Sequence, residues 1–381
     1  MADLLYKLQV PIIRMLSPRK IFSKNCTELS QWFADAKGTS LRTVKIPAWI
    51  KKSFVCKEQK IAGCNCPIIE PRTGYKPGAP AVLFIHGGGF LIEAAPVHWI
   101  AAATIVRKTG AQLWFCSYPQ LPEATFYEST DAVLVCYYAM KAHFASVGLS
   151  DTPIVFVGDS AGAYLAITAT RSLIAAKQGA NQGLQQGETQ GEDQGVAQGE
   201  AQDVDQGVAQ GVDQCESAGH DVNLTTEANI ANTTDIPAVT DIPDRLILIS
   251  PPTCIVNNPL VKEQMLAIAP RDLMIPISLL DTLQKMMAAQ DTRDDFFLMP
   301  LEGSCKGFPP TAVYCGSEEI FYPLMPDFIK QLRAANALIG FYPGNGLCHI
   351  YPYVPSSLDC RRALLHICKL ISETTCSVPK A

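Results

Sequence analysis

The chain has no long uninterrupted run of apolar residues. Hydrophobic residues make up 48% of the 381 positions and charged residues 18%, which is ordinary for a globular protein. A membrane-spanning helix needs roughly 20 consecutive apolar residues, so a multi-span membrane protein is excluded. Residues 4–16 are rich in leucine and isoleucine, but Lys7, Pro11 and Arg14 interrupt them. They form a poor signal-peptide core, and we expect a helix that lies on the fold or on a membrane surface.

The sequence also lacks the cysteine spacing of a metal site. Its fourteen cysteines are scattered, without repeated CxxC pairs, so we expect no metal and no other cofactor. Cys116 and Cys315 stand inside apolar runs, where a reduced thiol packs as a small hydrophobe. This favours the cytoplasm, with or without membrane association. Asn-x-Thr sequons at Asn25, Asn223 and Asn232 keep the endoplasmic reticulum as an alternative.

Lysine and arginine are absent from residues 178–243. From Gln178 to Gln214 a glutamine recurs at about every fourth position, usually followed by glycine. Regularly spaced glycines disfavour a helix, and little in the segment is apolar enough to bury. We therefore predict a disordered, low-complexity insertion over residues 178–243. It is rich in acidic residues, so the rest of the chain is net basic although the whole chain carries −5.

Outside this insertion, short apolar runs alternate with stretches of helical periodicity. Such alternation is typical of an α/β fold with a mostly parallel sheet flanked by helices. The expected strands are 81–85, 112–116, 154–157, 246–249, 311–315 and 338–342. The expected helices are 97–108, 129–145, 161–177, 276–289 and 323–335. We divide the chain into an N-terminal segment (1–75), a first core part (76–177), the insertion (178–243) and a second core part (244–381).

Ser160 stands in a G-x-S-x-G motif, Gly158-Asp159-Ser160-Ala161-Gly162. The motif alone is weak, because chance produces it in about one in ten chains of this length. Here an expected strand precedes it and an expected helix follows it. This strand–turn–helix arrangement exposes a serine on a tight turn, where it can act as a nucleophile. A plain glycine-containing turn is the alternative interpretation.

A second glycine-rich motif, His86-Gly87-Gly88-Gly89, directly follows the strand expected at 81–85. Successive glycines let backbone N–H groups face a ligand. Ester hydrolysis passes through an oxyanion that such donors stabilise. We predict an oxyanion hole built from the N–H groups of Gly87, Gly88 and Ala161.

A nucleophilic serine needs a base, and the chain contains only six histidines. His220 lies in the predicted insertion, and His98, His143 and His366 fall within stretches of helical pattern, where a packed or solvated histidine is ordinary. His86 belongs to the glycine-rich loop. His349 follows the strand expected at 338–342 and is selected by elimination and position.

The acid that orients the histidine should lie between the serine and the histidine in the chain. Glu318 and Glu319 follow the strand expected at 311–315, and either could serve. Because all these residues follow the carboxyl ends of parallel strands, we expect them to converge at one edge of the sheet. Cys348 precedes the histidine, and we expect bulky thiol reagents to inhibit through it.

At these motifs the chain resembles the hormone-sensitive-lipase-like branch of the α/β-hydrolases, including fungal steryl acetyl hydrolases. Residues 117–123, Ser-Tyr-Pro-Gln-Leu-Pro-Glu, resemble the family's DYxLxPE segment, and residues 316–320 resemble its acid motif. The resemblance covers about residues 76–177 and 244–370, and it favours Glu318 as the acid. It implies the α/β-hydrolase fold with a helical cap built largely from residues 1–75, to which residues 262–300 contribute a second piece. Ala163 departs from the family pattern, where glycine often stands.

The expected function is hydrolysis of apolar carboxylic esters through an acyl-enzyme on Ser160. A steryl acetyl hydrolase is the narrower alternative. A non-catalytic small-molecule receptor of the same fold is an alternative from another class, which the presence of His349 disfavours. The expected partners are a small apolar ester and a membrane surface, and no nucleic acid.

Overall fold

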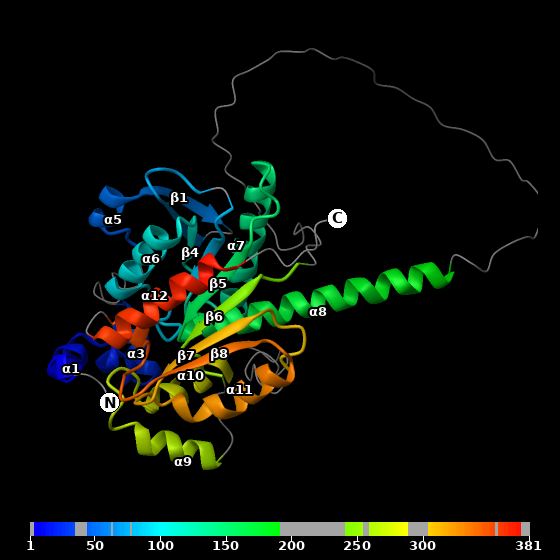
Figure 1. Ribbon diagram of the computed structural model, residues 1–381. Coiled ribbons are helices and arrows are strands. Elements are labelled where there is room, and N and C mark those ends of the chain that lie inside the picture. The colour runs from blue at the N-terminus through cyan, green and yellow to red at the C-terminus, as the bar shows by residue number, and fades with distance from the viewer. Residues whose placement is uncertain are drawn as a thin grey trace, which may run out of the picture.

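The computed structural model describes residues 4–34, 44–61, 64–76, 78–190, 241–253, 259–288, 304–354 and 357–374. Figure 1 shows a central sheet with helices packed around it and one helix, α8, that projects far from the body. Within the described ranges, no helix combines the length and apolar character needed to cross a bilayer.

Eight strands form one sheet in the order β1-β2-β4-β3-β5-β6-β7-β8. At one edge of the sheet, β1 pairs antiparallel with β2, and β2 pairs antiparallel with β4; all other neighbours are parallel. The strands are β1 Val55–Ile61, β2 Cys64–Glu70, β3 Ala81–Ile85, β4 Leu113–Cys116, β5 Ile154–Asp159, β6 Arg245–Ile249, β7 Thr311–Gly316 and β8 Leu338–Gly344. The predicted α/β class with a mostly parallel sheet is confirmed, and each of the six expected strands is present.

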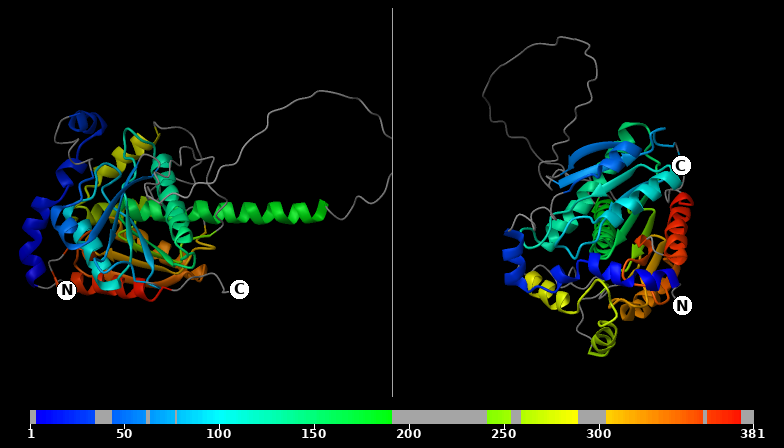
Figure 2. Two further views of the ribbon diagram at one scale, coloured as in Figure 1. Left: turned by 90° about the horizontal axis from the view of Figure 1, so that it is seen from above. Right: turned by 90° about the vertical axis from the view of Figure 1, so that its left-hand side faces the viewer.

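The central strands are buried on both faces. Every residue of β3, β4, β5 and β7 is buried, because helices cover both sides of the sheet. Helix α6 packs against α12, and α7 packs against α8, as two separate layers (Figure 2). In register, Ile85 of β3 lies opposite Cys116 of β4 and Gly158 of β5. The carboxyl ends of these strands are therefore level, and the loops that follow them meet at one edge.

Helices fill the connections between the strands. They are α1 Leu4–Leu16, α2 Arg19–Phe22, α3 Cys26–Ala34, α5 Ala48–Ser53, α6 Pro96–Thr109, α7 Phe126–Ser146, α8 Ala161–Gln190, α9 Pro259–Ile268, α10 Ser278–Ala288, α11 Met325–Ala334 and α12 Leu358–Ser372, with short 3-10 helices η2 Tyr322–Leu324 and η3 Tyr351–Tyr353. The local sequence fixes where helix α7 begins. Thr125 Oγ1 accepts the Glu128 N–H while the Glu128 carboxylate accepts the Thr125 N–H, which caps α7.

The N-terminal segment is not all cap. Residues 55–70 form β1 and β2 and belong to the main sheet, because antiparallel strands can extend a parallel sheet at its edge. Helices α1, α2 and α3 precede these strands in the segment where a cap was expected. They contact the second expected piece: the Cys26 thiol donates to the Thr282 carbonyl, and the Thr282 hydroxyl donates to the Lys24 carbonyl. The part of 262–300 beyond residue 288 lies outside the described residues.

Helix α8 runs further than the sequence indicated. We expected it to end near Lys177, where the glutamine–glycine repeat begins, but it continues to Gln190. Its first half is buried against the sheet. Because extending a formed helix costs far less than nucleating one, a glycine-containing segment can continue it. The rest of the predicted insertion up to residue 240 lies outside the described residues.

Candidate active site

Ser160 occupies a tight turn between β5 and α8. Its φ of 49° is left-handed, a conformation that costs a non-glycine residue about 1–3 kcal/mol and is concentrated at functional sites. The turn is held from both sides, since Ser160 N–H donates to the Ile249 carbonyl at 2.8 Å and its carbonyl accepts the Tyr164 N–H at 3.1 Å. A Cβ on Gly162 would lie 2.0 Å from the Ile85 carbonyl oxygen. Only glycine fits there, so the G-x-S-x-G pattern follows from packing.

His349 and Glu319 form a buried pair beyond the ends of β8 and β7. His349 Nδ1 lies 2.8 Å from Glu319 Oε2, and both side chains are at most 3% exposed. Among the described residues, the buried Nε2 atom of His349 has no hydrogen-bond partner. His349 and Ser160 line the same cavity. The carboxylate thus orients the ring by one nitrogen and leaves the other available for a proton.

The electrostatic surroundings favour the protonated form of His349. Burial by itself lowers the pKa of the His349 imidazole, but the charge and hydrogen bond of Glu319 outweigh it, with smaller contributions from Asp272 and Asp159. The net result is a pKa above the ordinary histidine value of 6.5. An imidazolium formed during reaction would be stabilised in the same way.

Glu318, the acid that the family resemblance favoured, does not contact His349. Its Oε2 lies 2.8 Å from Arg271 Nε, and its side chain is 30% exposed. Two hydrogen bonds from the backbone to distant segments explain this: Glu318 N–H donates to the Leu347 carbonyl, and Ile320 N–H donates to Asp272 Oδ2 at 3.0 Å. These two bonds fix the turn so that the neighbouring glutamates point apart. Of the two glutamates, the structure therefore places Glu319, and not Glu318, against His349.

Asp272 is a residue that sequence reasoning missed. It is buried, and its carboxylate also accepts the N–H groups of Met274 and Ile275 at 2.8 and 2.9 Å. Burial raises the pKa of this carboxyl despite these bonds. On its far side, Arg19 of α2 donates to the Asp272 carbonyl at 2.6 Å. Asp272 thereby ties the turn that carries Glu319 to the cavity wall and to the N-terminal helices.

The glycine-rich loop lies directly against the serine turn. A Cβ on Gly87 would lie 2.3 Å from Asp159 Oδ2 and 3.0 Å from the Ser160 Cβ. Gly88 has a φ of 142° and lines the cavity beside Ser160. The structure thus brings Gly87 and Gly88 to the serine, and Ala161 stands next to it as the first residue of α8. Their role as oxyanion donors stays a prediction.

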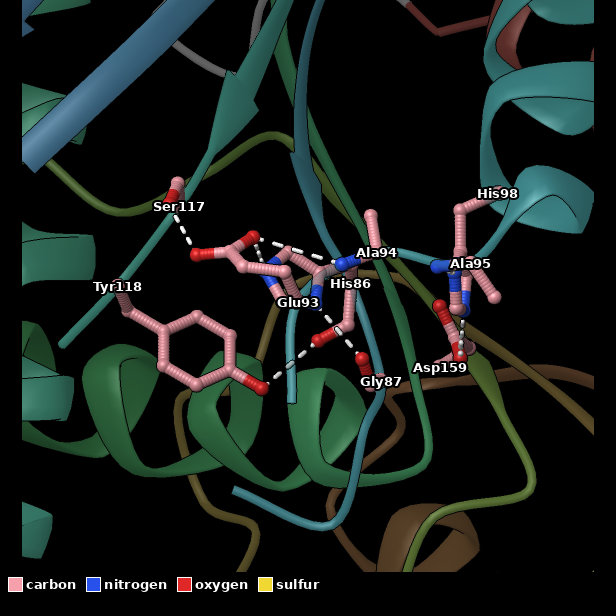
Figure 3. A network of polar contacts seen from close by, with 9 residues as sticks. All are labelled: His86, Gly87, Glu93, Ala94, Ala95, His98, Ser117, Tyr118 and Asp159. Carbon is pink, nitrogen blue, oxygen red and sulfur yellow. Dashed lines mark hydrogen bonds and ion pairs between the residues drawn. The ribbon is translucent and has the colours of Figure 1, made fainter. Parts of the chain in front are cut away.

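His86 holds this loop through polar contacts with Gly87 and Glu93 (Figure 3). Its Nδ1 lies 2.6 Å from the Gly87 carbonyl oxygen and its Nε2 lies 3.1 Å from Glu93 Oε2. Both ring nitrogens therefore face acceptors. Burial lowers the pKa of His86, but Glu93 more than compensates, and the pKa is raised overall. Ser117 donates to the other Glu93 oxygen, and the Tyr118 hydroxyl donates to the His86 carbonyl.

His98 was expected to be an ordinary helical histidine, but it reaches the serine turn (Figure 3). Its Nδ1 accepts the Ala95 N–H at 2.8 Å, so its Nε2 carries the proton and donates to Asp159 Oδ2 at 3.1 Å. This pair fixes the residue immediately before Ser160. The only sequence signal was Asp159 itself inside the motif, because 61 positions separate the two partners. Of the others, His366 contacts Tyr314 away from the site, and His220 lies outside the described residues.

Cys348 contradicts the expectation of a reactive thiol. Its side chain is fully buried, and burial raises its pKa to about 12. A thiol in this state is neither accessible nor ionised near neutral pH.

An apolar cavity of about 590 Å³ opens onto Ser160. Besides Ser160 and His349, its wall comes mainly from α1, the loop over residues 88–95 and the start of α6, with Phe22 of α2 and the turn after Asp272. The apolar residues of this wall include Ile12, Ile13, Leu16, Phe22, Ile92, Val97, Met274, Ile275, Ile350 and Val354. A cavity of this size and character suits a small apolar molecule.

Comparisons with known proteins agree with this architecture. A family described as "alpha/beta hydrolase fold" matches residues 82–210 and 216–352. A solved structure, an esterase from the bacterial hormone-sensitive lipase family, superimposes with a TM-score of 0.64 at 15% identity, covering 98% of this chain and 99% of its own.

Two curated relatives match shorter stretches. Lipase 2 of Moraxella sp. (strain TA144) is 34% identical over 94 residues, 25% of this chain and 22% of its own length. Acetyl esterase of Salmonella schwarzengrund (strain CVM19633) is 28% identical over 138 residues, 36% of this chain and 38% of its own. The chain thus spans well under half of each relative. Given the extent of the family match, the chain belongs to the α/β-hydrolase family, within which it is similar to the hormone-sensitive-lipase-like branch.

Proposed function

We propose that the chain is a serine carboxylic-ester hydrolase whose catalytic triad is Ser160, His349 and Glu319. The observation that carries the proposal is the buried His349–Glu319 pair. Within the described part of the chain, the Nε2 atom of His349 has no hydrogen-bond partner, and His349 lines the same apolar cavity as Ser160. A buried ion pair gains little stability for its desolvation cost. Catalysis explains why such a pair lies in the cavity that Ser160 also lines.

The reaction would begin with proton transfer. His349 Nε2 takes the proton of Ser160 Oγ as that oxygen bonds to the ester carbonyl carbon. The carbonyl oxygen becomes an oxyanion, and the N–H groups of Gly87, Gly88 and Ala161 would stabilise it. The bond to the alcohol oxygen then breaks, and His349 gives its proton to that oxygen. Alcohol leaves, and an acyl group stays on Ser160.

Water completes the cycle. His349 Nε2 takes one proton from a water molecule whose oxygen attacks the acyl carbon, and the bond to Ser160 Oγ breaks. The proton returns to Ser160, and a carboxylic acid leaves. Throughout, Glu319 holds the Nδ1–H of the ring and stabilises the imidazolium. No step needs a metal or an organic cofactor.

The substrate class follows from the cavity. Its wall is largely apolar, with Ser160 and His349 among its polar residues, which suits an ester with an apolar acyl or alcohol part. Lipase 2 and acetyl esterase, named above as relatives, are consistent with this class. A steryl acetyl hydrolase is the narrower candidate, since a rigid apolar alcohol could lie along Ile12, Ile13 and Leu16 with its acetyl group at Ser160.

A substrate panel tests the proposal. Purified full-length chain would be assayed with p-nitrophenyl esters from acetate to palmitate and with a steryl acetate, each beside Ser160→Ala. Turnover that disappears in Ser160→Ala supports the hydrolase, and the preferred ester names the class. A chain that binds apolar esters without turning any of them over is instead a receptor of the same fold.

A further inference from the structure

Helix α1 has two apolar faces, and only one of them packs on the protein. Tyr6 is buried, and Val10 and Ile13 are partly buried against the core. Leu8, Ile12, Met15 and Leu16 stand on another side of the helix and are exposed by 67, 52, 75 and 75%. Leu8, Ile12 and Leu16 follow one another at spacings of four residues, and Met15 lies three residues after Ile12, so all four share one side of the helix. An exposed cluster of this kind marks an interaction surface.

The exposed stripe, Leu8, Ile12, Met15 and Leu16, adjoins the entrance of the active-site cavity. Ile12 and Leu16 belong to the stripe and also line the cavity that holds Ser160. Leu8 and Met15 extend the stripe outward. Figures 1 and 2 show α1 at the outer edge of the molecule, on the side opposite to the projecting end of α8. A surface that covers the stripe would therefore face the cavity entrance.

The charged residues of α1, which carries the exposed stripe, and of α2 are all basic. Lys7 and Arg14 of α1 and Lys20 of α2 are exposed, and residues 4–24 contain no aspartate or glutamate. Lys7 and Arg14 are seven residues apart and so share one flank of the helix. An amphipathic helix with exposed apolar residues and basic flanks matches the two components of an anionic lipid surface, its acyl region and its headgroups.

We propose that the exposed stripe of α1 and its basic flanks dock the protein on an anionic lipid surface, from which apolar esters enter the cavity directly. The inference rests on the proposed function for the role of docking, but the docking itself is independent of catalysis. Leu8 and Met15 would enter the acyl region, Lys7, Arg14 and Lys20 would meet headgroups, and an ester would pass between Ile12 and Leu16 toward Ser160.

The experiment uses full-length chain and sedimentation with vesicles of phosphatidylcholine containing about one third phosphatidylglycerol. The double variant Leu8→Asp/Met15→Asp removes the stripe without touching a residue that lines the cavity. Leu365→Asp is the matched control, since Leu365 of α12 is also an exposed leucine, at 47%, and lies away from the cavity. Ser160→Ala separates docking from catalysis.

Wild type, Leu365→Asp and Ser160→Ala should bind the vesicles alike, and raising NaCl to about 0.5 M should weaken binding. The double variant should bind at least about tenfold less and keep its turnover of a soluble short-chain ester within about twofold. Wild type that stays in the supernatant, or a double variant that binds like wild type, would overturn the proposal. Self-association that depends on the stripe, seen by light scattering without vesicle binding, would also overturn it in favour of a second copy as the occupant. Should the protein prove inactive on every ester, the vesicle result still decides docking.

Discussion

Glu319 Oε2 lies 2.8 Å from His349 Nδ1, and no part of the Glu319 side chain is exposed. Glu318, one residue earlier, points away to Arg271. Two adjacent glutamates therefore differ completely in environment. Glu319 can orient the imidazole and stabilise its positive charge in a buried site. Glu318 makes a partly exposed ion pair that contributes little to stability.

The first prediction separates these two residues. Glu319→Ala should lower kcat on a soluble ester by at least about a hundredfold, because the imidazole loses its orientation and the partner of its cation. Glu318→Ala should stay within about threefold of wild type, since exposed pairs contribute roughly 0–1 kcal/mol. Steady-state kinetics with circular dichroism as a folding control measure both. Equal losses, or a larger loss in Glu318→Ala, would contradict the assignment.

The second prediction concerns pH. His349 acts as a base only when neutral, and its pKa is raised above 6.5 by Glu319, Asp272 and Asp159 against the opposing effect of burial. As the pH decreases, activity should therefore fall with a midpoint above 6.5, which is a higher pH than for an ordinary histidine.

A variant tests the cause of this midpoint. Asp272→Asn removes one of the charges that raise the His349 pKa but leaves Glu319 in place, so the acid limb of kcat/KM should move to lower pH. A limb that is unmoved in Asp272→Asn, or a wild-type midpoint below 6.5, would contradict the electrostatic account.

Most of the framework was predictable from sequence because it depends on local patterns. Buried parallel strands appear as short apolar runs, and the strand expected at 81–85 is reproduced as β3. The position of Ser160 followed likewise from strand, glycine turn and helix. Such features are encoded within a few residues, so no knowledge of the tertiary structure was needed.

The misassigned and missed residues depend on contacts between distant segments. The orientation of the two glutamates is set by Asp272, 48 positions before Ile320 in the chain, and no local pattern distinguishes Glu318 from Glu319. His98 is helical as expected, but its contact with Asp159 could not be foreseen because the two residues lie on different elements, 61 positions apart. Residues 55–70 were expected in the cap on the family resemblance alone, and the mostly polar, exposed sequence of β1 gives no apolar run that would have indicated a strand.

The third prediction reverses an expectation from the sequence. Cys348 lies beside the proposed base, yet it is fully buried with a pKa of about 12. Bulky maleimides should therefore leave native activity unchanged, and mass spectrometry should find Cys348 labelled only after denaturation. Inhibition by maleimide that is lost in Cys348→Ser would show that the site opens enough to expose this thiol.

The fourth prediction concerns the segment after Lys177. Helix α8 begins beside Ser160 and runs away from it, so its far end lies on the other side of the molecule from the cavity (Figure 2). Joining Lys177 to Pro243 with a short Gly/Ser linker should keep kcat/KM on a soluble ester within about twofold, since loop length alone costs only about 0.6 kcal/mol per doubling. A tenfold loss in a folded variant would mean that this segment reaches the active site.

The same deletion removes acidic residues and no lysine or arginine. A tethered acidic segment can shield a basic surface from polyanions. Binding of the shortened chain to anionic vesicles at low salt should therefore increase relative to the full chain, and unchanged or weaker binding would exclude a shielding role.

The most direct test of the central claim is the identity of the residue that reacts. The full chain would be treated with a p-nitrophenyl phosphate triester, and the modified residue mapped by mass spectrometry beside Ser160→Ala and His349→Ala. We predict one adduct per chain on Ser160, none in Ser160→Ala, and labelling at least about a thousandfold slower in His349→Ala, because the triad acts as a unit. An adduct on another residue, or a Ser160→Ala variant that still hydrolyses esters at the wild-type rate, would contradict the account.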